Sequence, residues 1–144
     1  MKRLILIVAA CLLALASHAS TVHTPLSFLD GWVRAAPSVA KVMAGYGRLT
    51  NATSEPLRID SLSSPAFERV ELHEMSMNGG VMKMRRRDPI TLEPNQELPL
   101  EPGGWHLMLI GPKTPQPAGQ LVEIEITTDQ GVYVFSLPVR EPKP

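Results

Sequence analysis

The sequence has 144 residues, and its 14 lysines and arginines balance its 14 aspartates and glutamates. This length suffices for one domain with a hydrophobic core, and the balanced charge lacks the basic excess that marks proteins binding nucleic acid or an anionic membrane surface. The single cysteine, Cys11, excludes an internal disulfide.

Residues 1–19 have the features of a secretory signal peptide. Two basic residues are followed by an apolar run over residues 4–16 and by the small-x-small cleavage pattern Ser17-His18-Ala19. The run is too short to span a bilayer, and no later stretch reaches the roughly 20 apolar residues that a transmembrane helix needs. Residues 8–11 loosely resemble a lipoprotein processing box, but the apolar core continues beyond Cys11. We therefore expect cleavage after Ala19 and export to the periplasm, without a lipid anchor or stable membrane insertion.

The rest of the chain is predicted to be all-β. Its many prolines argue against long interior helices, and short β-rich runs recur between turn signals. The predicted strands cover residues 31–35, 40–51, 57–62, 67–75, 81–86, 90–92, 97–100, 105–110, 120–127 and 132–139. Many short strands indicate a Greek-key sandwich or barrel, here over residues 31–140. Residues 20–30 and 141–144 are expected to be tails.

Methionine and histidine concentrate between positions 73 and 108. His73-Glu74-Met75 and His106-Leu107-Met108 each pair an imidazole with a thioether two residues later, and residues i and i+2 share one face of a strand. Met82 and Met84 share a face of the next strand, reached through the turn at residues 76–80. Thioether sulfur is a neutral, polarizable donor that suits monovalent copper, and imidazole complements it. If these strand ends lie together, they form a Cu(I) site.

Each of these residues also has a plainer interpretation. Methionines commonly fill cores, and a single histidine is more often hydrogen-bonded than metal-bound. The repeated His-x-Met pairing favours ligands, whereas Met43 is assigned to the core and Glu71 and Glu74 to the surface. Met75 and Met77 either capture an ion transiently or cap an apolar rim, and the rim is the simpler choice. As an alternative function, the methionines would form the contact surface of an exported protein-interaction module.

The spacing of the motif resembles that of the periplasmic copper chaperones of the PCuAC family. Ten residues separate His73 from Met84, and twenty-one separate Met84 from His106, which begins the His-x-Met pair ending at Met108. The similarity extends, more weakly, over residues 31–139. It implies a cupredoxin-like Greek-key β-sandwich or barrel that binds one Cu(I) per chain through His73, Met84, His106 and Met108. Since the spacing selects Met84, we expect Met82 to be a packing residue.

The resemblance also implies partners and a role. Family members are implicated in delivering copper to cytochrome c oxidase, so subunit II is the expected acceptor, with a Sco-type thiol protein as a companion. Copper storage or tolerance is the alternative role. We expect a monomer and no enzymatic activity, because the three histidines after Ala19 fit no Ser-His-Asp signature. A blue-copper electron carrier would need a cysteine ligand, which the mature chain lacks.

Overall fold

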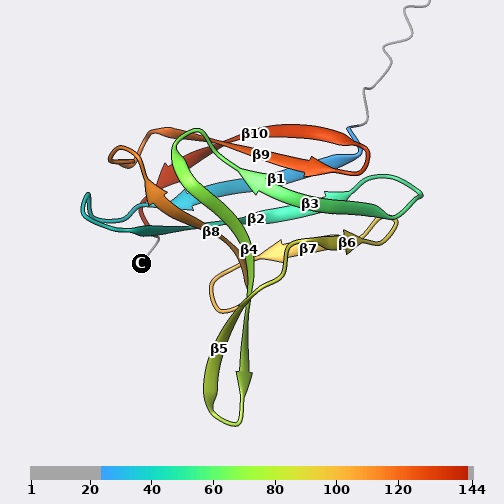
Figure 1. Ribbon diagram of the computed structural model, residues 1–144, viewed down its shortest axis with the longest axis horizontal. Helices are drawn as coiled ribbons and strands as arrows, with labels where there is room; N and C mark the ends of the chain where they lie inside the picture. The colour runs from blue at the N-terminus through green and yellow to red at the C-terminus, as the bar shows by residue number, and fades with distance from the viewer. Residues whose placement is uncertain (1–23, 143–144) are drawn as a thin grey trace, which may run out of the picture.

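The computed structural model describes residues 24–142, which form ten β-strands and no helix (Figure 1). The predicted signal peptide, residues 1–19, lies outside the described residues. The strands are β1 (Leu26–Arg34), β2 (Val42–Asn51), β3 (Leu57–Ser63), β4 (Phe67–Asn78), β5 (Val81–Arg86), β6 (Ile90–Leu92), β7 (Glu97–Leu100), β8 (Trp105–Pro112), β9 (Leu121–Thr128) and β10 (Gly131–Arg140). Over residues 24–142 there is thus no apolar helix that could cross a membrane. The all-β prediction is confirmed, and each predicted strand has its counterpart.

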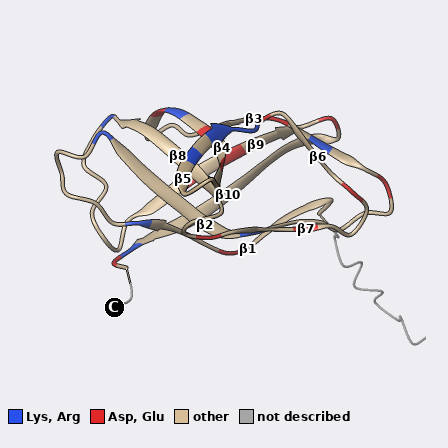
Figure 2. Ribbon diagram, turned by 90° about the horizontal axis from the view of Figure 1, so that it is seen from below, with Lys and Arg blue, Asp and Glu red and all other residues tan. Residues whose placement is uncertain are grey.

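Eight of the strands close into a barrel. The order runs β4-β8-β7-β2-β1-β10-β9-β3, and a pairing between β3 and β4 completes the ring. Many neighbours, such as β4 and β8, are distant in sequence, as in Greek-key folds. Seen from below, the barrel is flattened into two layers, with β3, β4 and β9 in one and β1 and β2 in the other (Figure 2). Charges of both signs are scattered over this view, in keeping with the balanced composition.

The barrel interior is filled by alternate residues of each strand. In β9, Val122, Ile124 and Ile126 are fully buried, while the residues between them are exposed or half-buried. Leu72 of β4 and Leu107 of β8 are likewise fully buried. Burying one such side chain contributes roughly 1.5–3 kcal/mol. Because side chains alternate between faces, the residues flanking Leu72 and Leu107 must point out of the barrel.

The first strand was predicted to begin too late. It begins at Leu26 instead of Gly31, and Leu26 is fully buried opposite Asn51 of β2. The register shifts between Leu29 and Trp32, where Asp30 has a φ of 53°. This bulge interrupts the alternation that would identify the strand, so residues 26–30 resemble a tail in the sequence although they belong to the barrel.

A long hairpin of β4 and β5 projects away from the barrel (Figure 1). Pairing runs from His73 opposite Arg86 to Asn78 opposite Val81, so the loop is two residues long and shorter than the five predicted. Gly79 and Gly80 have φ values of 60° and 77°, as a type I′ turn requires. Beyond β4, β5 pairs with no other strand of the described chain, and all six of its residues are exposed.

Candidate metal centre

The register of β4 and β8 brings the two interior histidines face to face. His73 is the direct partner of His106, and their ring centroids are 5.9 Å apart. Leu72 and Leu107, which are also partners, point into the core, so both imidazoles lie on the outer face of the sheet. Residues 33 positions apart in sequence are thus neighbours because of the β4–β8 pairing.

Three of the four predicted ligands line a single cavity. Met84, His106 and Met108 border a hollow of about 210 Å³, together with Met75 of β4. The remaining wall comes from β2 and from the loop before β8, through Val42, Met43, Ala44, Tyr46 and Gly103. His73 does not line this hollow but lies beside His106 on the neighbouring strand. The structure therefore gathers two of the predicted sulfur ligands and one predicted imidazole in one place, with the second imidazole next to them.

The hydrogen bond of His106 leaves one ring nitrogen free. Its Nδ1 lies 3.1 Å from the carbonyl oxygen of Gly104, and a carbonyl only accepts, so Nδ1 carries the proton in the neutral ring. Nε2 then keeps its lone pair. A metal-binding histidine commonly has this arrangement, with the second nitrogen held by a backbone carbonyl or a carboxylate.

His73 is held in the same way by a carboxylate. Its Nε2 donates to Oε2 of Glu71 at 2.8 Å, and both side chains are almost buried. Nδ1 therefore carries the lone pair, yet it is buried without a hydrogen-bond partner. An unpaired buried polar atom costs about 1–3 kcal/mol, and such an atom in a native structure calls for an explanation, which a bound ion can supply. A metal ion is the partner that fits this nitrogen, with the thioethers and His106 nearby.

Glu71 is the residue of the candidate site that sequence reasoning missed, since it was assigned to the surface. It lies opposite Met108 and shares the outer face of β4 with His73. The i, i+2 spacing from His73 in a predicted strand was the signal that could have identified it. Glu74 points to the other face and accepts a hydrogen bond from Nε of Arg87 at 2.7 Å.

An ion-pair network fixes this part of β4. Arg86 donates to Asp88 at 2.6 Å and lies 3.5 Å from Glu71. Asp88 also accepts the backbone N–H of Leu72 at 2.9 Å. Burial works against ionisation of Asp88, but the hydrogen bonds from Arg86 and Leu72 outweigh it and hold its pKa below the ordinary value of 3.8. The basic run at residues 85–87 is therefore largely engaged in ion pairs within the chain.

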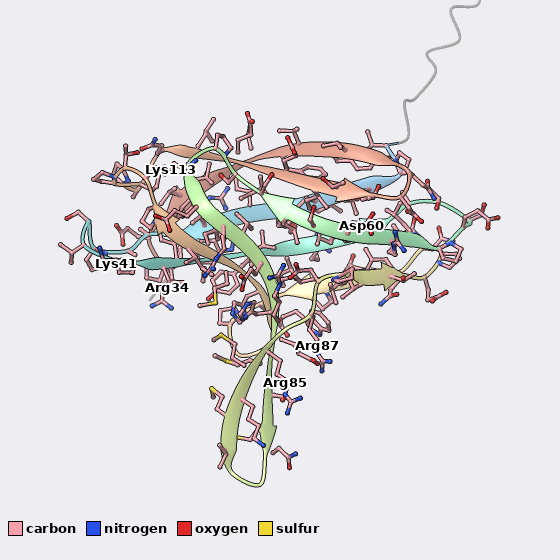
Figure 3. All side chains as sticks on the ribbon, in the orientation of Figure 1. Arg34, Lys41, Asp60, Arg85, Arg87 and Lys113 are labelled. Atoms are coloured by element: carbon pink, nitrogen blue, oxygen red, sulfur yellow. The ribbon has the colours of Figure 1, made fainter. Side chains whose placement is uncertain are left out.

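Among the described methionines, Met43 is a core residue, Met75 and Met108 are half-buried, and Met77, Met82 and Met84 are exposed. Met43 is buried, as predicted. The prediction that Met82 is a packing residue is wrong, because 57% of its surface is exposed, and Met84 is 45% exposed. The reason is that, within residues 24–142, β5 pairs only with β4 and all of its residues are exposed. Figure 3 shows the sulfur atoms along one side of the hairpin and Arg85 and Arg87 on the other.

Histidine and acidic side chains alone do not form a metal site in residues 24–142. No three His, Cys, Asp or Glu residues of this part of the chain are grouped so as to hold an ion. The candidate set differs from such sites because half of its donors are thioethers, which favour soft monovalent ions over zinc or magnesium.

Comparison with known proteins finds a matching family and a relative that covers most of the chain. The model of the family described as "Putative lipoprotein LpqE-like" matches residues 26–139. The protein named "Putative lipoprotein Lxx21020" from Leifsonia xyli subsp. xyli is 30% identical over 146 residues, which cover 93% of this chain and 87% of that protein.

Solved structures share the fold. The copper-bound PCuAC domain from PmoF2 superimposes with a TM-score of 0.68 at 22% identity, covering 83% of this chain and 95% of that domain. The solution structure of CuI-DR1885 from Deinococcus radiodurans gives a TM-score of 0.56 at 25% identity, covering 88% of this chain and 85% of the other. The chain therefore has the cupredoxin-like β fold of the PCuAC domains, as predicted.

Proposed function

The chain belongs to the LpqE-like family, and from this starting point we propose that it is an exported Cu(I) carrier that binds one ion through His73, Met84, His106 and Met108. The observation that carries the proposal is the unpartnered, buried Nδ1 of His73, which Glu71 orients from the opposite side of the ring. His106, with its Nε2 free, faces it across the strand pair. The copper-bound state of structural neighbours with this fold adds support.

The donor set suits transport of the ion. Two thioethers and two neutral imidazoles bind Cu(I) without the deprotonation that thiolate ligands require. Oxidation to Cu(II) shifts the preference toward nitrogen and oxygen donors, so the site favours the reduced ion. Met84 is nearly half exposed, and an acceptor can therefore reach one ligand position while the others still hold the ion. Transfer to an acceptor with thiolate ligands is downhill.

The role we propose is delivery to the copper centre of cytochrome c oxidase, with subunit II as the acceptor and a Sco-type thiol protein as a companion. Storage or tolerance is the alternative role for the same site. A transfer assay from the loaded protein to apo subunit II separates them. Delivery predicts movement of the ion within minutes of mixing, whereas retention of copper would favour storage.

Export forms part of the proposal. We propose that residues 1–19 are removed and that the protein acts in the periplasm as a monomer. The lipoprotein description of the family names the competing outcome, a lipid on Cys11. Mass spectrometry of the exported protein distinguishes an N-terminus at Ser20 from a lipidated N-terminus at Cys11.

Competition with a chromophoric Cu(I) chelator tests the site itself. Met84→Leu and Met108→Leu keep side-chain volume but remove sulfur, and both should weaken binding while the domain remains folded. Met77→Leu is the matched control, because Met77 lies on the hairpin and does not line the cavity. Leucine variants at 84 and 108 that titrate like the wild type would refute the thioether ligands. Absence of any Cu(I) binding would favour the alternative of a protein-interaction module.

A further inference from the structure

The outer end of the β4–β5 hairpin carries thioethers that the proposed carrier site does not use. Met75 is the direct cross-strand partner of Met84, and Met77 is the direct partner of Met82. Since i and i+2 residues share a face, all four side chains project from the same face of the hairpin. Direct partners have Cβ atoms about 4.5–5.5 Å apart and diagonal pairs about 7–8 Å, so their flexible side chains can converge on one ion.

Packing does not explain Met77 and Met82. Met77 is 69% exposed and Met82 57% exposed, and each lies where no other element of the described chain covers the hairpin. Exposed thioethers gain little of the burial energy that justifies a core methionine. The rim-capping role expected for Met77 therefore lacks an apolar rim to cap. Another role must account for two opposed methionines at the end of a projecting arm.

The chemistry of this face selects a soft cation. Within the hairpin, the carboxylate of Glu74 points to the opposite face and pairs with Arg87. Lys83 and Arg85 also belong to that opposite face, as partners of Ser76 and Glu74. The methionine face thus offers neutral sulfur donors, and Arg86, which shares this face at its inner end, is paired with Asp88. Thioethers suit Cu(I) and Ag(I) but not divalent hard ions. The positive charges of Lys83 and Arg85 on the opposite face disfavour tight binding of a cation by the methionines.

The thioethers also lead toward the carrier site. Met77 and Met82 lie nearest the Gly79-Gly80 turn, and Met75 and Met84 are one step closer to the barrel. Met75 and Met84 line the same cavity as His106 and Met108. Each step from the tip inward therefore moves to the next pair on the same face, two residues further along each strand. Imidazole ligands are present only at the inner end, so affinity should rise inward.

We propose that Met75, Met77 and Met82 form a second, weaker Cu(I) site that accepts the ion at the hairpin tip and passes it to the inner site. The binding at the tip stands on the geometry of the hairpin alone, whereas the inward transfer rests on the proposed function. Transfer proceeds by exchange of sulfur ligands at Met84, with no change in oxidation state and no proton released.

Titration of the full mature chain with Ag(I), a redox-stable probe, tests the site by NMR of ¹³C-labelled methionine methyl groups. The wild type should bind a first ion that shifts the methyls of Met84 and Met108, and a second, weaker ion that shifts those of Met75, Met77 and Met82. The double variant Met77→Leu/Met82→Leu should lose the second step and keep the first. Unshifted hairpin methyls at excess Ag(I), or two ions bound by the double variant, would overturn the inference.

The variant Met84→Leu/Met108→Leu separates this inference from the proposed function. It should lose the tight step while Met77 and Met82 still respond to Ag(I). If it instead keeps the tight step, the proposed carrier site is wrong. The tip site is then supported if the methyl signals of Met77 and Met82 shift with Ag(I), and refuted if they do not. Uptake of Cu(I) by the inner site, followed by stopped flow, should be slower in Met77→Leu/Met82→Leu at unchanged inner affinity. Equal uptake rates would refute the relay.

Discussion

Replacing Glu71 by glutamine should weaken Cu(I) binding although Glu71 is not a ligand. The carboxylate accepts the Nε2–H of His73 at 2.8 Å, and the two side chains are only 12% and 13% exposed, so solvent screens the interaction little. Glutamine keeps the size and one acceptor oxygen but loses the charge that strengthens the hydrogen bond to the ring. Removal of such an outer partner typically costs about tenfold to a hundredfold in metal affinity. Because the acceptor is retained, we expect about tenfold, or about 1.4 kcal/mol.

The assay is chelator competition, combined with ¹⁵N NMR of the histidine rings in the metal-free protein. Glu74→Gln is the matched control: its carboxylate lies on the same strand but faces the opposite side and pairs with Arg87. It should leave the affinity unchanged. In the wild type, the ¹⁵N shifts should place the proton of His73 on Nε2. A proton on Nδ1, or equal affinities for Glu71→Gln and the wild type, would refute the reasoning that Glu71 orients a ligand.

Three further outcomes are expected. Met82→Leu should leave the tight Cu(I) affinity nearly unchanged in chelator competition, and the loss of one sulfur scatterer from the singly loaded protein by X-ray absorption would contradict this. Because the pKa of Asp88 is lower in the folded state than its ordinary 3.8, its stabilising effect is present above that pH and is lost as the pH falls through the folded value. Urea unfolding should show a shallower acid loss in Asp88→Asn. Gly47→Ala should destabilise the barrel by roughly 1–3 kcal/mol, since φ is 141° and the new Cβ would lie 2.8 Å from the Gly31 backbone; an unchanged thermal midpoint would contradict it.

The strands and the types of ligand could be predicted from short stretches of sequence. Which strands pair with one another could not. Alternation revealed β9, and the His-x-Met spacing revealed that each pair shares a strand face. Nothing in the sequence near His73 indicates that β4 pairs with β8, because that pairing joins residues far apart in the chain. The proximity of His73 to His106 therefore came from the family resemblance alone.

The position of β5 at the edge of the sheet could not be predicted from the sequence either. An interior strand and an edge strand can share the same pattern, so Met82 was assigned to packing although all six residues of β5 are exposed. Glu71 was missed for a different reason. Its role depends on the lone pair and proton of a neighbouring ring, and a strand pattern places residues on a face without showing which atoms they bond.

The free edge of β5 has a consequence for the protein at high concentration. Unpaired strand edges offer backbone groups to other chains and can start edge-to-edge aggregation. Lys83, Arg85 and Arg86 place three positive charges within this six-residue strand. A second copy aligned on the same edge would bring like charges together, which disfavours stacking of hairpins. Replacing these residues with neutral ones should therefore produce oligomers or fibrils, even though none of them belongs to the hydrophobic core.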